Sequence, residues 1–232
     1  IATRFPASLA LIAGAFALSF LLGTALGVTA AATRGRWPDS AIRGVAIALA
    51  ASPGFWVALL LVALFAVGLG WLPACCALPP GATAAEADLW DRLRHMVLPI
   101  AALSVVGIAP LILHTRQRLA GFLESDAARH LAAHGATPLG LAFGPGLRHA
   151  LGPAITVHLA GAGELFGGSV LAETVFGWPG LGAATVRAAM GADAPLLMGI
   201  ALFTLLFVFA GNLLADVAAR LLDPRLREGG GA

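Results

Sequence analysis

The chain has 232 residues, of which 59% are hydrophobic and only 11% are charged. Soluble domains carry about 25% charged residues, so this composition excludes a soluble protein and predicts an integral membrane protein. All 14 basic residues are arginine, and the lack of lysine excludes a P-loop, whose lysine reaches the nucleotide phosphates. If ATP drives this protein, another chain must hydrolyse it. The arginines are spread along the sequence, which does not predict a nucleic-acid partner.

The first predicted span covers about residues 7–32, because the chain carries no charge over that stretch. Gly23 and Gly27 give this span a small-residue face that allows another helix to approach closely. A signal peptide is the alternative, but the apolar run is too long for one. Three arginines in residues 34–43 indicate a cytoplasmic loop and place Ile1 outside. We therefore expect a further segment upstream of this sequence.

Four more apolar stretches predict four more spans, at about residues 44–70, 95–113, 150–171 and 195–215. Ser52-Pro53-Gly54 predicts a kink in the second span, and Gly107 and Pro110 predict an interruption of the third. Asp223-Pro224 is expected to end the last helix. The predicted fold class is therefore an all-α, multi-pass helical membrane bundle. It has five spans in this sequence, a sixth expected upstream, and a single domain over residues 1–232.

The arginines set the predicted orientation. Ten lie on the side predicted to be cytoplasmic and four outside, which agrees with the positive-inside rule and places the C-terminus in the cytoplasm. Residues 71–94 and 173–195 are then external. The adjacent Cys75 and Cys76 suit neither a disulfide framework nor a zinc site, so we interpret them as small residues of the first external loop. The ten inside are Arg34, Arg36, Arg43, Arg116, Arg118, Arg129, Arg148, Arg220, Arg225 and Arg227.

A polar, helix-forming island at residues 124–153 separates two long apolar runs. Ser125 or Asp126 is predicted to cap a helix over about residues 127–134, which Gly135 ends in a left-handed conformation. Thr137-Pro138 then begins a second short helix, and Gly144-Pro145-Gly146 ends it. Two short helices on one side of a membrane protein make either a docking surface or a stiff connector. The residues alone leave both interpretations open.

Three motifs carry a resemblance to a known family. The island, with Gly135, Thr137-Pro138-Leu139 and Arg148-His149-Ala150-Leu151, resembles the cytoplasmic loop of bacterial ABC-importer permeases, in particular the dipeptide/oligopeptide/nickel permease family. The block ETVFGWPGLG at residues 173–182 and the segment LLDPRLR at residues 221–227 match the same family in the same order. One departure is Gly144-Pro145-Gly146, where the family tends to be basic.

The resemblance implies that the coupling loop, about residues 116–149, carries the helix that docks on an ATP-hydrolysing subunit. It also implies a second homologous permease, two ABC ATPase subunits and an external solute-binding protein as partners. The setting is the bacterial cytoplasmic (inner) membrane. The chain itself is then no enzyme and has no catalytic residue, metal or cofactor. The residues expected at the ATPase contact are Asp126, Ala128, Arg129, Ala132, Gly135, Thr137, Pro138 and Leu139.

His158 and Glu164 are ionisable residues inside a predicted span, and such residues are functional by default because they are expensive to bury in lipid. Six residues apart, they point about 120° from each other on a helix and do not form a metal clip by themselves. Each either lines the substrate path, as we expect also for Phe166, or bonds to a neighbouring helix. The resemblance places Glu173, Phe176, Trp178, Pro179 and Gly180 at an external gate, where Trp178-Pro179-Gly180 favours a turn or re-entrant element.

The predicted function is that of a permease subunit of an ATP-driven, binding-protein-dependent importer of peptides or a related small solute. Nickel or a metal chelate is the alternative cargo, and the sequence does not decide between them. A multi-pass membrane enzyme using His158 and Glu164 is a different class, but no HExxH or comparable set is present. An ion-coupled carrier would need an inverted repeat, which is not visible.

Overall fold

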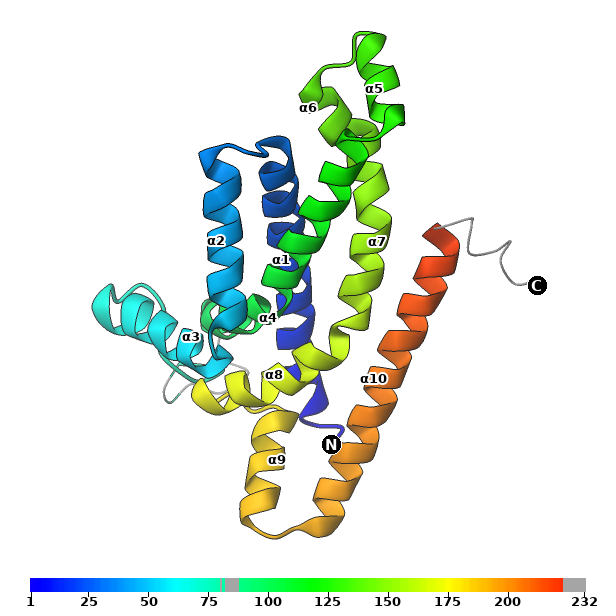
Figure 1. Ribbon diagram of the computed structural model, residues 1–232. Helices are drawn as coiled ribbons and strands as arrows, with labels where there is room; N and C mark the ends of the chain where they lie inside the picture. Colours follow the sequence, from blue (N-terminus) through cyan, green and yellow to red (C-terminus); the bar gives the residue numbers. More distant parts are fainter. Residues whose placement is uncertain (80, 82–87, 223–232) are drawn as a thin grey trace, which may run out of the picture. The chain divides into compact units, whose positions relative to one another are not determined.

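The computed structural model describes residues 1–79, 81 and 88–222, and within these residues the chain is helical, with no strand (Figure 1). The predicted helix stop at Asp223-Pro224, two of the arginines (Arg225 and Arg227) and part of the predicted external loop lie outside the described residues. The helices are α1 (Phe5–Ala32), α2 (Trp37–Ala51), α3 (Gly54–Leu61), α4 (Leu89–Leu123), α5 (Asp126–Ala133), α6 (Pro138–Leu141), α7 (Leu147–Ala160), α8 (Ala162–Val175), α9 (Leu181–Met190) and α10 (Ala194–Leu222), with π-helical turns η1 (Val62–Gly68) and η2 (Ala142–Gly146).

Three of the described helices, α1, α4 and α10, are long and apolar enough to cross a membrane. Two further pairs of helices qualify if each pair, broken by a few residues, counts as one span, which gives up to five. One pair runs from α2 through α3 and η1, and the other from residue 139 through α7 and α8. The prediction of an all-α, multi-pass membrane bundle is confirmed.

The bend predicted at Ser52-Pro53-Gly54 is present, as a break between α2, which ends at Ala51, and α3, which starts at Gly54. Two other details of the predicted spans were wrong. The third span is not interrupted, because α4 runs unbroken for 35 residues through Gly107 and Pro110. The fourth is two helices, with Gly161 as the residue between α7 and α8. A glycine inside a helix is tolerated when neighbouring side chains pack against it, as Ser19 and His158 do at Gly107. At Gly161 the nearest atoms to a Cβ are only the carbonyl oxygens of His158 and Val157 in the preceding turn.

The contacts divide the chain into two compact units, to both of which the long helices α1, α4 and α10 contribute. The first unit comprises Ile1–Leu18, Ser52–Val106 and Gly163–Phe209, and the second comprises the remaining residues. In the first unit the main core contains Leu11, Leu103, Leu165 and Trp178. In the second, Val28, Leu119, Ala142 and Ala150 form one cluster, and a second cluster forms around Ile112.

The small-residue face predicted in the first span lies against α4 within the second unit. A Cβ on Gly23 would lie 2.9 Å from the Cβ of Leu111, and one on Gly27 would lie 2.7 Å from the Cβ of Thr115 and 2.9 Å from the carbonyl oxygen of Ile112. Real Cβ atoms do not approach so closely, so both positions require glycine. The close helix–helix approach predicted from this pattern is confirmed.

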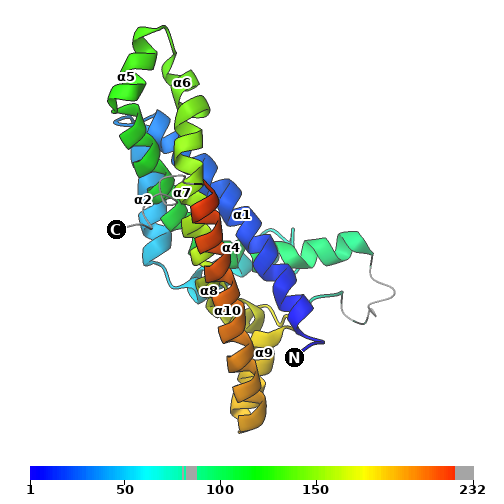
Figure 2. The same ribbon diagram turned by 90° about the vertical axis from the view of Figure 1, so that its right-hand side faces the viewer.

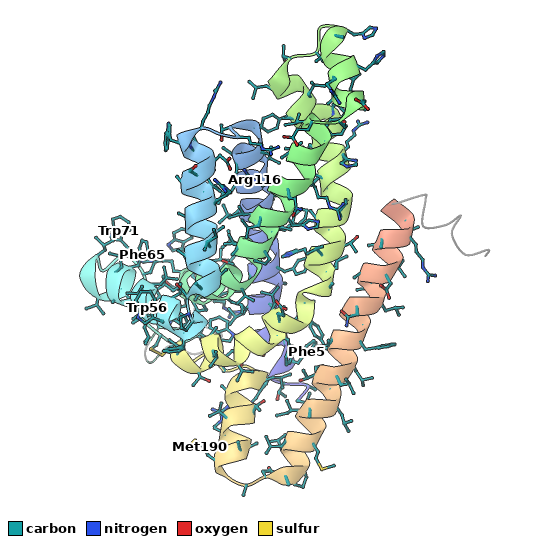
Figure 3. All side chains as sticks on the ribbon, viewed as in Figure 1. Phe5, Trp56, Phe65, Trp71, Arg116 and Met190 are labelled. Atoms are coloured by element: carbon teal, nitrogen blue, oxygen red, sulfur yellow. A yellow bond between two sulfur atoms is a disulfide. The ribbon has the colours of Figure 1, made fainter. Side chains whose placement is uncertain are left out.

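An ion-pair network that the sequence did not predict ties α2 to α4 in the second unit. The guanidinium of Arg116 donates from Nε and Nη2 to the two carboxylate oxygens of Asp39, at 2.5 and 2.8 Å. The backbone N–H of Gly35 also donates to Asp39, at 3.1 Å, and the Nε of Arg43 lies 3.4 Å away. Figure 3 labels Arg116 on α4, next to α2. Asp39 is only 2% exposed, so its carboxylate has lost its water. The hydrogen bonds from Arg116 and Gly35 offset that loss, as a buried ion pair requires.

Cys75 and Cys76, interpreted above as unpaired loop residues, form a disulfide with each other. Cys76 has a positive φ of 73°, and its N–H donates to the carbonyl oxygen of Phe176 at 2.7 Å. A disulfide between adjacent cysteines closes only a small local ring and joins no distant parts of the chain, so the cysteine spacing of disulfide frameworks does not indicate it.

Candidate functional site

The docking segment (residues 127–143) lies in the second unit beyond the ends of α4 and α7, as both ribbon views show (Figures 1 and 2). Ser125 is the residue that caps α5: its hydroxyl accepts from the N–H of Ala128 at 3.3 Å and donates to the carbonyl oxygen of Phe122 at 2.6 Å. Gly135 follows the helix with φ +91°, the left-handed conformation predicted for it. The helix start and stop predicted from the sequence are therefore confirmed.

The second short helix also forms where it was predicted. The hydroxyl of Thr137 accepts from the N–H of Gly140 at 3.1 Å, which caps α6 at its first turn. Gly144 breaks the helical path with φ −94° and ψ −106°, and α7 begins three residues later. Because α4 extends to Leu123 and α7 starts at Leu147, the part of the coupling loop outside the long helices is shorter than residues 116–149.

The surface of the docking segment combines small residues with a few large apolar ones. Leu131, Leu139 and Phe143 expose 38%, 64% and 57% of their surface, while Ala128 is buried. Each large side chain therefore leaves apolar area uncovered by the rest of this chain. Of the other residues expected at an ATPase contact, Arg129 pairs with Asp126 at 2.5 Å in the open, Ala132, Gly135 and Thr137 are exposed, and Pro138 begins α6.

A hollow of about 680 Å³ lies at the base of this segment, in the second unit. The last turns of α4, the start of α5 and the first turn of α7 enclose it. His114, Arg118 and His149 give it a basic lining, and the ring of Phe122 lies 5.5 Å from that of His149. The docking segment is thus joined to the long helices through the cluster that contains Ala142, with this open hollow beside it.

The gate block (residues 173–182) lies in the first unit and comprises the end of α8, the connecting turn and the start of α9, with its two aromatic side chains buried. Phe176 and Trp178 are 1% and 6% exposed, and the indole N–H of Trp178 donates to the carbonyl oxygen of Ala7 at 3.0 Å. Glu173 is 0% exposed and accepts from the hydroxyl of Ser8 at 2.6 Å. Pro179 is exposed and Gly180 precedes α9. The turn predicted at Trp178-Pro179-Gly180 is present, because the N–H of Gly180 donates to the carbonyl oxygen of Trp178 at 2.9 Å. A separate turn precedes it, where Gly177 has φ +59°.

The residues predicted to line the path have different surroundings. His158, in the second unit, is buried, with its Nε2 at 3.4 Å from the hydroxyl of Ser19 and its ring 5.6 Å from that of Phe20. Phe166, in the first unit, is buried against Phe207, with ring centroids 5.4 Å apart. Glu164 is exposed on α8. The break at Gly161 means that the 120° separation expected on one straight helix does not describe His158 and Glu164.

Sequence reasoning missed the partners of these groups. Ser8 was not singled out, although it is a polar residue at the start of an apolar helix, and it is the residue that bonds Glu173. Asp39 was passed over as well, although it is the one acid among the arginines of the first predicted cytoplasmic loop. Polar residues isolated in apolar or oppositely charged surroundings are the signal that would have found both.

Residues 23–228 match the family described as the inner membrane component of binding-protein-dependent transport systems. The chain belongs to this family. It is therefore a transport subunit, not an enzyme, and the membrane component of an ABC transporter that works with ATPase subunits. Its multi-pass helical structure agrees with that role.

Curated relatives agree with the family assignment. The chain is 32% identical over 229 residues to the oligopeptide transport system permease protein AppB of Bacillus subtilis, covering 97% of this chain and 71% of that one. It is 32% identical over 240 residues to the di/tripeptide transport system permease protein DppB of Pseudomonas aeruginosa, with shares of 97% and 71%. The probable D,D-dipeptide transport system permease protein DdpB of Escherichia coli is 34% identical over 243 residues, with shares of 98% and 72%.

Solved structures share the fold. An inward-facing structure of the MetNI methionine ABC transporter superimposes with a TM-score of 0.74 at 16% identity, over 96% of this chain and 95% of that one. A second crystal form of the same transporter gives 0.70 at 18% identity, over 94% and 93%. At these identities the likeness extends to the arrangement of helices and not to the cargo.

Proposed function

We propose that this chain is the permease of a binding-protein-dependent importer whose cargo is a short peptide. The relatives named for oligopeptides, di- and tripeptides and dipeptides support peptide cargo, since each matches almost the whole of this chain. The complex would contain a second permease of similar fold, two ATPase subunits and an external solute-binding protein. ATP would bind to the partner subunits, because this chain has no lysine for a P-loop.

The observation that carries this proposal is the exposed apolar tip of the docking segment. A capped helix, a left-handed glycine and a second capped helix hold Leu131, Leu139 and Phe143 in the open. Complete burial of a large apolar side chain contributes about 1.5–3 kcal/mol, and these three side chains, already partly covered, would each contribute a fraction of that. An ATPase surface that covers them therefore gains affinity from a preformed shape. A connector without a partner would have no need of large apolar side chains in these positions.

In the proposed orientation the docking segment and the C-terminus lie in the cytoplasm, and the gate block lies outside. Closure of the two ATPase subunits around ATP would push on the docking segment. The long helices, which are continuous through both units, would carry that push and switch the path between inward-open and outward-open states. The binding protein would deliver peptide to the gate side.

Glu164 is our proposed path residue. Its carboxylate is exposed on α8, an apolar helix, and a carboxylate facing lipid hydrocarbon would cost several kcal/mol. A wet path between two permeases would instead hydrate it or offer it the amino terminus of a peptide. Glu164→Gln should keep expression and basal ATP hydrolysis near the parent level and reduce uptake. Equal transport by Glu164→Leu would show that the carboxylate does not meet the cargo.

Uptake assays test the cargo directly. The complex would be reconstituted in proteoliposomes with its binding protein and supplied with ATP on the ATPase side. Labelled dipeptide, labelled tetrapeptide and nickel ion are compared at the same concentrations. We expect ATP-dependent accumulation of peptide and none of nickel. Accumulation of nickel without peptide would replace the proposed cargo while leaving the permease role intact.

A further inference from the structure

The gate block contains a carboxylate that the structure buries without a countercharge. Glu173 is 0% exposed, and no arginine or histidine among the described residues forms an ion pair with it. An ionised group in this position is stable only if hydrogen bonds replace the lost water. The surroundings of Glu173 therefore show which bonds the chain supplies.

Both carboxylate oxygens are bonded, and every donor comes from within the first unit. The hydroxyl of Ser8 donates to Oε1 at 2.6 Å, and the backbone N–H of Ala183 donates to Oε2 at 3.1 Å. The N–H of Leu181 donates in turn to the hydroxyl of Ser8, at 2.7 Å. Leu181 and Ala183 lie in the first turn of α9, where backbone N–H groups have no partner within the helix. Glu173 accepts from the N–H of Ala183 directly, and it holds the hydroxyl of Ser8, which accepts from the N–H of Leu181.

Ser8 and Ala183 both donate to Glu173, so the side chain at position 173 must accept two hydrogen bonds. A carboxylate accepts at both oxygens, whereas the amide of glutamine accepts only at one. If that oxygen faces the N–H of Ala183, the N–H₂ group faces the hydroxyl of Ser8, which then loses the acceptor to which it donates. Glutamine has nearly the shape of glutamate, so the requirement concerns acceptors and not volume. Aspartate keeps both acceptors on a shorter stem.

Two glycines of the block are explained by the same carboxylate. A Cβ on Gly180 would overlap the carboxyl group of Glu173, whose carbon and two oxygens are the three atoms nearest to it. A Cβ on Gly182 would lie 2.9 Å from Oε2 of Glu173 but also 2.5 Å from the Cα of Val170. The backbone of the block is therefore folded directly against the carboxylate.

We propose that Glu173 is a positioning residue of the transport cycle: its carboxylate, through Ser8 and the first turn of α9, fastens α9 to the start of α1. The indole of Trp178, bonded to the carbonyl oxygen of Ala7, is a second fastening at the same place. The gate block then moves as one piece with the start of α1. The transport part of this inference rests on the proposed function, while the fastening itself is measurable without any cargo.

The fastening is tested by the mobility of α9 in the full complex, in nanodiscs, with Cys75 and Cys76 replaced by serine. A spin label at Met190→Cys reports on the far end of α9, where the side chain is 84% exposed (Figure 3). A label at Leu206→Cys, 67% exposed on α10, is the matched control. Glu173→Gln should increase the mobility at position 190 and leave position 206 unchanged. Unchanged mobility at position 190 overturns the proposal.

Transport separates the acceptor requirement from packing. We expect Glu173→Gln to lower the maximal rate of peptide uptake about tenfold, the effect of losing about one charge-assisted hydrogen bond, with basal ATP hydrolysis near the parent value. Glu173→Asp should retain more uptake than Glu173→Gln. If glutamine works better than aspartate, shape and not acceptance of hydrogen bonds is what matters, and the proposal fails. Ser8→Ala, which keeps the carboxylate, serves the same two readouts where Glu173→Gln does not assemble.

A double-mutant cycle on the thermal unfolding of the complex gives a test independent of transport. Gly180→Ala should lower the melting temperature in the parent, and less so in a Glu173→Ala background, where the carboxyl group has gone. Gly182→Ala is the control, because the Cα of Val170 still blocks its Cβ in both backgrounds. Equal effects of Gly180→Ala in the two backgrounds would contradict the packing on which the proposal stands. An absence of peptide uptake by the parent, with these couplings present, would remove the proposed function and leave the fastening.

Discussion

The docking segment and the gate block each connect longer helices, and their helix starts are capped in different ways. In the docking segment two helices are capped by their own hydroxyl residues, Ser125 and Thr137, and the large apolar side chains remain exposed. In the gate block the aromatic side chains are buried, and the first turn of α9 is capped from a distance by Glu173 and Ser8.

The difference indicates where each region finds its stability. Local caps make the docking segment a shape that holds by itself and is completed by a partner. Long-range bonds make the gate block part of the core of its own chain, with Ser8 and Glu173 separated by 165 residues in sequence. Changes in the docking segment should therefore affect binding of the ATPase subunit more than the stability of the chain. Changes in the gate block should affect stability and peptide uptake and leave the binding of the ATPase subunit unaltered.

The largest effect on coupling is expected from Gly135→Val. Gly135 has φ +91°, which a β-branched residue resists, although the space around its Cβ is open. Loss of this turn would misplace α6 relative to α5, so ATP-driven uptake should fall to background in proteoliposomes. The matched control is Gly135→Asn, because asparagine tolerates positive φ and should keep most of the uptake. Full uptake with valine would mean that the segment is only a connector.

A smaller effect, and one on stability, is expected from Trp178→Phe. The substitution keeps most of the buried ring and removes the indole N–H that donates to Ala7, a bond that contributes about 1 kcal/mol. The melting temperature of the complex should fall measurably. Trp37→Phe, at a side chain that is 81% exposed, should leave it unchanged. Equal melting temperatures for the two variants would show that the gate block is not held in the way the structure describes.

The smallest change in stability is expected from Arg129→Gln. Arg129 pairs with Asp126 on the surface, with the two side chains 72% and 95% exposed, and exposed pairs contribute little because water and salt screen them. The melting temperature of the chain should not change. Binding of the ATPase subunit, measured in parallel by the fraction that co-purifies at rising salt, should weaken. If Arg129→Gln lowers the melting temperature and leaves binding of the ATPase subunit unaltered, the docking segment behaves as we expect of the gate block, and the contrast between the two regions is wrong.

The sequence predicted those parts of the structure that depend on neighbouring residues. The cap at Ser125, the stop at Gly135 and the close approach at Gly23 and Gly27 follow from local rules of backbone and packing, and all three are present. The bond from Ser8 to Glu173 could not be predicted in that way, because it joins residues that only the fold brings together.

Helix breaks were the least predictable feature. Pro53 and Gly161 lie at breaks between helices, whereas Gly107 and Pro110, of the same residue types, lie inside the unbroken α4. The choice depends on what packs against each position: Gly107 lies against Ser19 and His158, which fill the space beside it. The aromatic and glycine residues of the gate block were placed near a turn correctly, but which of them are buried was set by contacts with α1.

Protection of the two regions by the ATPase subunits tests the central claim most directly. Single cysteines are introduced as Leu139→Cys in the docking segment and Thr174→Cys, an exposed residue of the gate block, in a background without Cys75 and Cys76. The rate of maleimide labelling in detergent is measured for the permeases alone and for the complex with ATPase. We predict strong protection at position 139 and none at position 174. Equal labelling of position 139 with and without the ATPase would contradict the assignment of this segment as the surface that a partner completes.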